Sequence, residues 1–242
     1  MKESRKLIYK FLLGVVAAII IMYLCYSNIK PREAIYEIID KNGHTIEINC
    51  AKLVKYTNED SLYIEYPYLN AKDKNSCSIN EQIYNAIIDK DMLWDDGYAD
   101  RAEIEYDISY IDDRIISIHF MGNKGKGMGN NNFDRGMNFN LSNGEILCLD
   151  SFYSLREMQE LLGNAIEEDK LSIKGIPLNE SEIEEYINNF LKEFDSNNYI
   201  SKTDNFYVKE DRIFFLAKPY QSMNQRICLE LEVDELPDIK SK

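Results

Sequence analysis

The chain has 242 residues, and its 42 acidic and 28 basic side chains give a formal net charge of −14. A chain this acidic repels polyanions, so we expect no nucleic-acid partner. Its two histidines and five cysteines show neither H-E-x-x-H nor C-x-x-C spacing, so we expect no zinc site and no other cofactor.

The N-terminus predicts a membrane anchor. Phe11–Tyr26 carries no charge, and the apolar stretch counted from Leu7 has about 20 residues with only Lys10 interrupting it, which is enough to cross a bilayer as a helix. Basic residues precede this stretch, which favours a cytoplasmic N-terminus. A cleaved signal peptide is the alternative, but Met22–Tyr26 is bulky and lacks the small residues of a cleavage site.

These features divide the chain into four parts. We predict a cytoplasmic tail at residues 1–6, a single-pass transmembrane anchor at 7–26, a short linker at 27–33 and an extracytoplasmic domain at 34–239. Because the first 26 residues carry a net charge of +3, residues 27–242 carry −17. Such a charge favours cationic partners, although acidity that serves only solubility is the alternative.

The predicted domain opens with strands and a helix. Ile35–Ile39 and Ile46–Cys50 flank an Asn42–Gly43 turn, which is the pattern of a β-hairpin. A further alternating strand follows, and Pro67 is expected to end it. Next comes a helix, with a capping box and apolar residues at helical spacing. The capping residues are Ser78 and Glu81, and the apolar ones are Ile79, Ile83, Ala86 and Ile87.

The clearest strand signal lies between residues 103 and 120. Apolar and polar residues alternate there, which predicts an antiparallel hairpin with one buried and one solvent-exposed face. The buried face holds Ile104, Tyr106, Ile108, Tyr110, Ile116, Ile118 and Phe120, and Asp112–Asp113 form the turn. A Gly- and Asn-rich loop, Gly122–Gly136, leads to a strand at Met137–Leu141 and an Asn143–Gly144 turn.

Two more helices and three strands complete the domain. Ser154 and Glu157 cap the first helix, and Asn179 and Glu182 begin the second. Strands are predicted at 206–208, 213–216 and 227–233. Because helices and strands come in runs, the fold class is α+β: an antiparallel sheet with about three packed helices, preceded by one N-terminal transmembrane helix.

Three groups of residues are candidates for binding. The acidic loop Asp89–Asp100 contributes Trp94, Asp95 and Asp96, although it lacks the ligand order of an EF-hand and a solvated loop is the alternative. The exposed hairpin face contributes Glu103, Glu105 and Asp107. In the Gly- and Asn-rich loop, where an ordinary hairpin connection is the alternative, the candidates are Lys124, Lys126, Asn131, Asn132 and Arg135.

Catalytic motifs are missing from the sequence. It has no G-x-S-x-G elbow and no G-x-x-x-x-G-K-[ST] phosphate loop. His44 and His119 are far apart in sequence, and the pattern indicates that His119 is a polar residue of a sheet face. We therefore expect no catalytic residue and no metal ligand, and paired carboxylates remain the one route to hydrolase chemistry.

Four cysteines fall in the predicted extracytoplasmic part, where disulfides can form. They permit two disulfides in three possible pairings, and buried thiols are the alternative. These residues are Cys50, Cys77, Cys148 and Cys228.

Four stretches of the sequence resemble a known family. They are LYIEYPYL at Leu62–Leu69, IEYDISYIDDRIISIHF at Ile104–Phe120, MNFNLSNGEILCLDSFY at Met137–Tyr153 and FYVKEDRIFFLAKPY at Phe206–Tyr220. In pattern and order they are similar to the extracytoplasmic domain shared by the lysozyme-sensing anti-sigma-V factor and the C-type peptidoglycan deacetylase. The resemblance implies an α+β domain of Gram-positive cell envelopes and, in one member, binding of a cationic lysozyme.

The chain also departs from that family. Gly127–Phe133 lacks the Gly-Gly-Ala-His-like motif, so no ligand-binding residue is carried over, and we expect neither the family's sigma-binding domain nor the deacetylase's catalytic domain. We expect a membrane-anchored extracytoplasmic binding or sensing domain for a cell-wall component such as a wall glycan, or for a cationic wall-active protein such as lysozyme. The alternatives are an envelope hydrolase that uses acidic residues and an accessory subunit of a membrane complex.

Overall fold

The computed structural model describes residues 36–39, 43, 45–56, 61–70, 73–88, 101–125, 131–168, 170–174, 185, 206–216, 228–236 and 238–240. These residues belong to one compact unit, Ile35–Lys242. None of the helices they form is long and apolar enough to cross a membrane, and the predicted anchor at residues 7–26 lies outside them.

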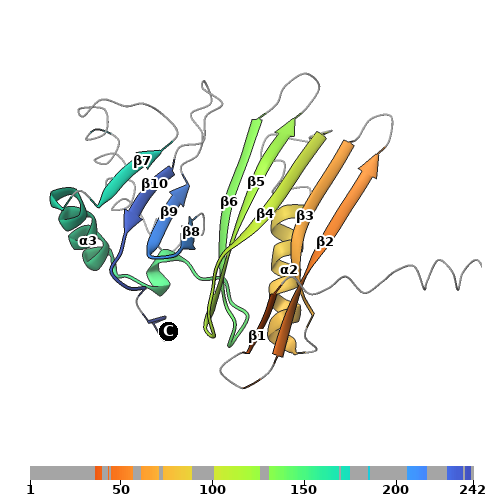
Figure 1. The fold of residues 1–242 in the computed structure, drawn as a ribbon, viewed down its shortest axis with the longest axis horizontal. Helices are drawn as coiled ribbons and strands as arrows, with labels where there is room; N and C mark the ends of the chain where they lie inside the picture. The colour runs from red at the N-terminus through yellow and green to blue at the C-terminus, as the bar shows by residue number, and fades with distance from the viewer. Residues whose placement is uncertain are drawn as a thin grey trace, which may run out of the picture. The chain divides into compact units, whose positions relative to one another are not determined.

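The fold contains two β-sheets (Figure 1). The first has six strands in chain order: β1 Tyr36–Ile39, β2 Thr45–Tyr56, β3 Ser61–Asn70, β4 Arg101–Ile111, β5 Ile115–Gly125 and β6 Asn131–Asn140. All neighbours in it are antiparallel except β3 and β4, which are parallel. A parallel pair needs a long crossover, and helix α2 (Lys74–Ile88) lies between these two strands in the chain.

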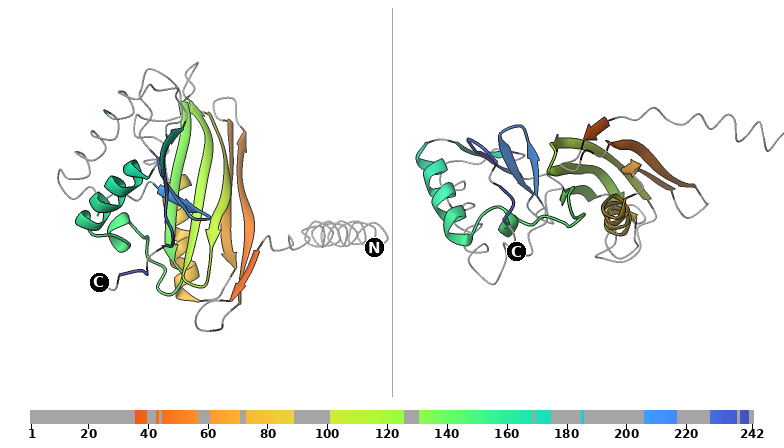
Figure 2. Two further views of the ribbon diagram at one scale, coloured as in Figure 1. Left: turned by 60° about the vertical axis from the view of Figure 1, so that its left-hand side comes forward. Right: turned by 90° about the horizontal axis from the view of Figure 1, so that it is seen from below.

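Helix α2 covers one face of the first sheet (Figure 2). Its four predicted apolar positions are all buried, as their helical spacing requires, and they form one core with the strands. The largest strand contributions to this core include Ile64, Ile104, Ile118, Phe120 and Phe139.

The start of helix α2 differs from the prediction. The helix begins at Lys74, because Asp73 caps it: Oδ1 of Asp73 accepts hydrogen bonds from the backbone N–H groups of Asn75 and Ser76, at 2.8 and 2.9 Å. The predicted cap, Ser78, lies in the second turn, and its hydroxyl donates to the carbonyl of Gly144 at 3.3 Å. The capping box at Ser78 and Glu81 was therefore wrong.

The second sheet has four antiparallel strands in the order β7-β10-β9-β8. Its bounds are β7 Leu171–Lys174, β8 Phe206–Lys209, β9 Arg212–Leu216 and β10 Cys228–Glu232. Helix α3 (Leu155–Glu167) and the 3-10 helix η1 (Leu149–Ser151) precede it, and the predicted capping box of Ser154 and Glu157 is confirmed. A second core joins α3 to this sheet, with Met158, Leu162, Phe206, Leu229 and Leu231 all buried.

The described fold is mostly β-sheet with two α-helices, which agrees with a mixed α+β class. The third predicted helix, from Asn179, lies outside the described residues. The Asn143–Gly144 turn is confirmed, since Gly144 has a φ of +74°, a left-handed conformation that suits glycine.

A β-bulge changes the faces of strand β4. The register with β5 shifts between Ile108 and Tyr110, so one extra residue, Ser109, is inserted. Ile108 therefore packs in the first core while Tyr110 packs against the second, and Ile111 takes the place beside the first core. The prediction that Tyr110 shares a face with Ile108 was wrong, because strict alternation does not show a bulge.

Three predicted strand boundaries were also wrong. Pro67 lies inside β3, which extends to Asn70; beyond Ile64 this strand pairs only with β2, and a residue without N–H is tolerated where one side has no partner. Most of the predicted Gly122–Gly136 loop is strand, because β5 and β6 continue to Gly125 and from Asn131.

No disulfide joins any two of the four cysteines in the described part of the chain: Cys50, Cys77, Cys148 and Cys228. They lie in β2, in α2, before η1 and in β10, which are elements far apart in the sequence.

Candidate functional site

Three carboxylates of strand β4 form a continuous acidic row. Glu103, Glu105 and Asp107 alternate with residues that are buried under helix α2, so all three lie on the opposite face of the first sheet. We call these three residues the acidic face. Glu103 and Glu105 are exposed, and no residue that the structure describes forms an ion pair with either. This group of candidate residues is therefore brought together as predicted.

The sheet register adds further polar groups beside the acidic face. Asp107 lies opposite His119 of β5, and Glu105 lies opposite Met121, which in turn pairs with Asp134 of β6. Nε2 of His119 and Oδ1 of Asp134 are 2.5 Å apart, and both side chains are mostly buried. His119 is thus a polar residue of the sheet face, as its position in the pattern predicts, and its ring pairs with Asp134 and is mostly buried.

Strand β8 of the second sheet lies against the same face of the first sheet, and its free backbone edge points towards that face. The carbonyl of Phe206 accepts a 2.7 Å hydrogen bond from Asn138 Nδ2, and the N–H of Val208 donates a 2.9 Å hydrogen bond to Ser117 Oγ. Side chains of the first sheet thereby form hydrogen bonds with the backbone groups at the free edge of β8. Without them, this edge could pair with another strand. The predicted wet face of the hairpin is consequently buried at Ser117, which is 0% exposed.

An aromatic stack links the two sheets. The rings of His119 and Tyr207 are stacked with centroids 4.0 Å apart, and Tyr207 stacks in turn on Phe214 at 4.6 Å. Burial raises the pKa of Tyr207, so the phenol is neutral at physiological pH. Lys209 of the same strand reaches Asp107 at 3.7 Å. The acidic face therefore meets the second sheet at Asp107 and leaves Glu103 and Glu105 open.

The basic and amide candidates do not form one site. Lys124 and Arg135 fall on the α2 side of the sheet by their register, and Lys124 Nζ lies 5.9 Å from the Phe133 ring centroid, a cation–π contact. Asn132 falls on the other side, opposite Asn123 and near Glu103. The remaining candidates lie outside the described residues or have side chains outside that description: Trp94, Asp95, Asp96, Lys126 and Asn131.

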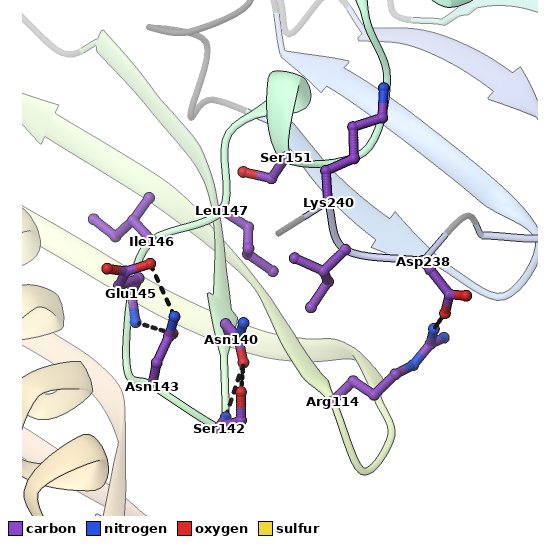
Figure 3. A pocket seen from close by; sticks show the side chains of 11 residues that line it. Arg114, Asn140, Ser142, Asn143, Glu145, Ile146, Leu147, Ser151, Asp238 and Lys240 are labelled. Atoms are coloured by element: carbon purple, nitrogen blue, oxygen red, sulfur yellow. Dashed lines mark hydrogen bonds and ion pairs between the residues drawn. The ribbon is translucent and has the colours of Figure 1, made fainter. Parts of the chain in front are cut away.

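A separate pocket of about 570 Å³ lies where the two cores meet (Figure 3). It is lined by Asn140 at the end of β6, by residues of the segment that follows as far as Leu147, by Ser151, by Arg114 of the β4–β5 turn and by residues 238–240. The Arg114 guanidinium pairs with Asp112 and with Asp238, at 3.1 and 2.6 Å. No sequence pattern indicated this pocket, because its walls come from three separate parts of the chain, at residue 114, between 140 and 151, and at 238–240.

Within the described residues, no group of three or more His, Cys, Asp or Glu side chains is arranged to hold a metal ion. The one histidine in this part pairs with a single carboxylate, Asp134.

No family model and no curated protein matches this chain. Solved structures that resemble it include two members of the DUF3298 family. The one from Bacteroides fragilis has 16% sequence identity and a TM-score of 0.46, covering 78% of this chain and 90% of the other. The one from Pseudomonas aeruginosa has 10% identity and a TM-score of 0.38, covering 78% and 88%. At these values the likeness assigns no function to this chain.

Proposed function

We propose that this chain is a membrane-anchored extracytoplasmic module that binds a cationic protein through its acidic face. The observation that carries the proposal is the pair of exposed carboxylates, Glu103 and Glu105, on adjacent outward positions of β4 without ion-pair partners among the described residues. The net charge of −17 over residues 27–242 supports it, because the whole domain attracts basic partners.

A sheet surface suits a protein partner better than a small molecule. Strands β3 to β5 hold their outward side chains in fixed positions, so lysine or arginine side chains of a partner meet carboxylates that need no rearrangement. On the neighbouring strands Lys52 pairs with Glu65, whereas Glu103 and Glu105 are exposed and have no ion-pair partner among the described residues.

Binding of a basic lysozyme to the full-length protein in detergent micelles tests the proposal. The variant E103Q/E105Q should bind about 3 to 10 times more weakly, since two exposed ion pairs of up to about 0.7 kcal/mol each would be lost. The matched control is E167Q/E235Q, which removes the same charge from exposed positions elsewhere.

Two results would reject this surface as the site. One is equal weakening by both double variants, which would leave only the total charge as the cause. The other is that an unrelated basic protein of similar charge binds within tenfold of the lysozyme, because specific recognition requires at least that difference, about 1.4 kcal/mol.

The anchored topology has its own test. Protease added to intact protoplasts should remove a C-terminal tag and leave an N-terminal tag protected, because the basic flank of the apolar segment keeps the N-terminus inside. A C-terminal tag that resists the protease would contradict the topology.

One observation favours a hydrolase as the second candidate. The His119–Asp134 hydrogen bond is the arrangement that orients an imidazole for general-base catalysis. We rank it second because the imidazole is stacked on Tyr207 and its side chain is only 14% exposed. Peptidoglycan turnover by the purified protein that D134N abolishes would reverse this order.

A further inference from the structure

The pocket in Figure 3 is lined by an amide group, that of Asn140, whose nitrogen has no hydrogen-bond partner among the described residues. Asn140 is 9% exposed, and its Oδ1 accepts hydrogen bonds from the backbone N–H and the hydroxyl of Ser142, at 2.9 and 2.6 Å. The backbone N–H fixes the orientation of the amide, because only an oxygen can accept from it. The Nδ2 group has no hydrogen-bond partner in the described part of the chain, and Figure 3 shows it on the side that faces Leu147.

The Nδ2 donor is open to the solvent of the pocket, because it is not among the buried polar atoms that lack a partner in the described residues. Here the donor faces a pocket large enough for a ligand, as about 570 Å³ falls within the usual range of ligand sites. An acceptor supplied by a ligand would complete the hydrogen bonding of Asn140.

The charges around the pocket favour a neutral ligand. Arg114 already pairs with Asp112 and Asp238, and Lys240 pairs with Glu157, so neither cation is available to an anion. In Figure 3 the ammonium of Lys240 is directed away from the pocket. The Glu145 carboxylate accepts a 2.9 Å hydrogen bond from Asn143.

The remaining wall is apolar. Leu147 is 3% exposed and packs in the second core, Ile239 packs against the same core, and Ile146 packs against the first. The pocket therefore offers the Asn140 Nδ2 donor beside an aliphatic wall. A carbonyl oxygen of a ligand can accept from the donor, and a methyl group next to that carbonyl can pack against the wall.

We propose that this pocket binds a neutral acetamide group, with its carbonyl oxygen accepting from Asn140 Nδ2 and its methyl packed against Leu147 and Ile239. The group can belong to an acetamido sugar or to a peptide main chain, and the pocket has room for the atoms attached to it. Ser151 Oγ and the Glu145 carboxylate, which line the same pocket, supply acceptors for the amide N–H. This site is separate from the acidic face, so it stands whether or not a cationic protein binds there.

Saturation-transfer NMR on the full-length protein in micelles tests the proposal with three probes: N-acetylglucosamine, N-acetyl-alanine-N′-methylamide and glucose. We expect transfer to the acetyl methyl of one or both acetamides, and at most one-fifth of that signal for glucose. The sugar and the peptide analogue distinguish the two sources of the group. Equal signals for glucose, or no transfer to either acetamide, would overturn the proposal.

Two variants locate the binding. N140D keeps the oxygen that accepts from Ser142 but replaces the donor with a second oxygen, so the acetyl signal should fall at least fivefold. N164D makes the same chemical change at an exposed position of helix α3, outside the pocket, and should leave the signal unchanged. An undiminished signal in N140D would refute the assignment. If N140D does not fold, I239A decides: removal of that wall should reduce the acetyl signal at least twofold, and no reduction would refute the assignment equally.

Discussion

At the scale of single residues, the approach of the two sheets depends on a missing side chain. A Cβ atom at Gly136 would lie 2.1 Å from the carbonyl oxygen of Phe206, where only backbone could move to relieve it. G136A should therefore push β8 away from β6 and lower the free energy of unfolding by about 1–3 kcal/mol, as overpacking does. Thermal unfolding followed by circular dichroism would measure the loss.

The matched control is G163A. Gly163 lies in helix α3, and a Cβ there would meet nothing within 4 Å. Alanine should stabilise this helix by up to about 1 kcal/mol, because glycine is a poor helix former. If G136A lowered the free energy of unfolding no more than G163A does, the close approach of β8 to β6 would not contribute to stability.

Glu157 provides a pH-dependent contribution to stability. Its hydrogen bond with Lys240, then that with Ser154, lowers its pKa to about 2. A glutamate in the unfolded chain has a pKa of about 4.3, so the folded state favours the ionised carboxylate. This stabilisation is present above that value and is lost as the pH falls towards 2.

The E157Q variant should show this window. Its melting temperature should lie below that of the wild type above about pH 5, and the difference should shrink as the pH falls towards about 2. Because the side chain is 54% exposed, salt should also weaken the effect. A difference that stays constant from pH 2 to 6 would show that the carboxylate charge is not its cause.

At the scale of elements, the start of helix α2 separates the predicted cap from the observed one. D73A should destabilise the protein by about 0.5–2 kcal/mol, because two backbone N–H groups lose their acceptor. E81A, which removes the other half of the predicted capping box, should cost less than about 0.5 kcal/mol, since Glu81 is exposed in mid-helix. Chemical unfolding of both variants measures these costs, and a larger loss in E81A would restore the predicted cap.

Local patterns predicted most of the elements and part of the site. Alternation placed Glu103, Glu105 and Asp107 on one face, because the side chains of a regular strand point alternately to either side. The pattern failed at Ser109, where the bulge is fixed by the partner strand, and at Gly122–Gly136, where pairing between strands overrides glycine's preference for turns.

The contacts that no local pattern could show are those between distant segments. Asn138 and Ser117 read as ordinary polar positions of a sheet face, and their role became clear only when β8, some 70 to 90 residues later in the chain, was seen to lie against them. The pocket at Asn140 was missed for the same reason. Its walls come from residues that pack against two different cores.

At the scale of the whole molecule, the net charge predicts how a partner arrives. A domain with about 17 excess negative charges raises the rate at which a basic protein encounters it, while the contacts at the acidic face govern how long the complex lasts. Salt shortens the Debye length from about 10 Å at 0.1 M to about 3 Å at 1 M, so it weakens the long-range attraction most strongly.

Association and dissociation rates should therefore respond differently to salt and to mutation. In surface plasmon resonance with the full-length protein and a basic lysozyme, the association rate constant should fall at least tenfold between 0.1 and 1 M salt, with a smaller change in dissociation. E103Q/E105Q should also speed dissociation, because it removes contacts of the complex itself, whereas E167Q/E235Q should only slow association. An association rate constant that salt leaves unchanged would mean that the acidic charge does not steer the partner, and unaltered dissociation in E103Q/E105Q would place the contact on another surface.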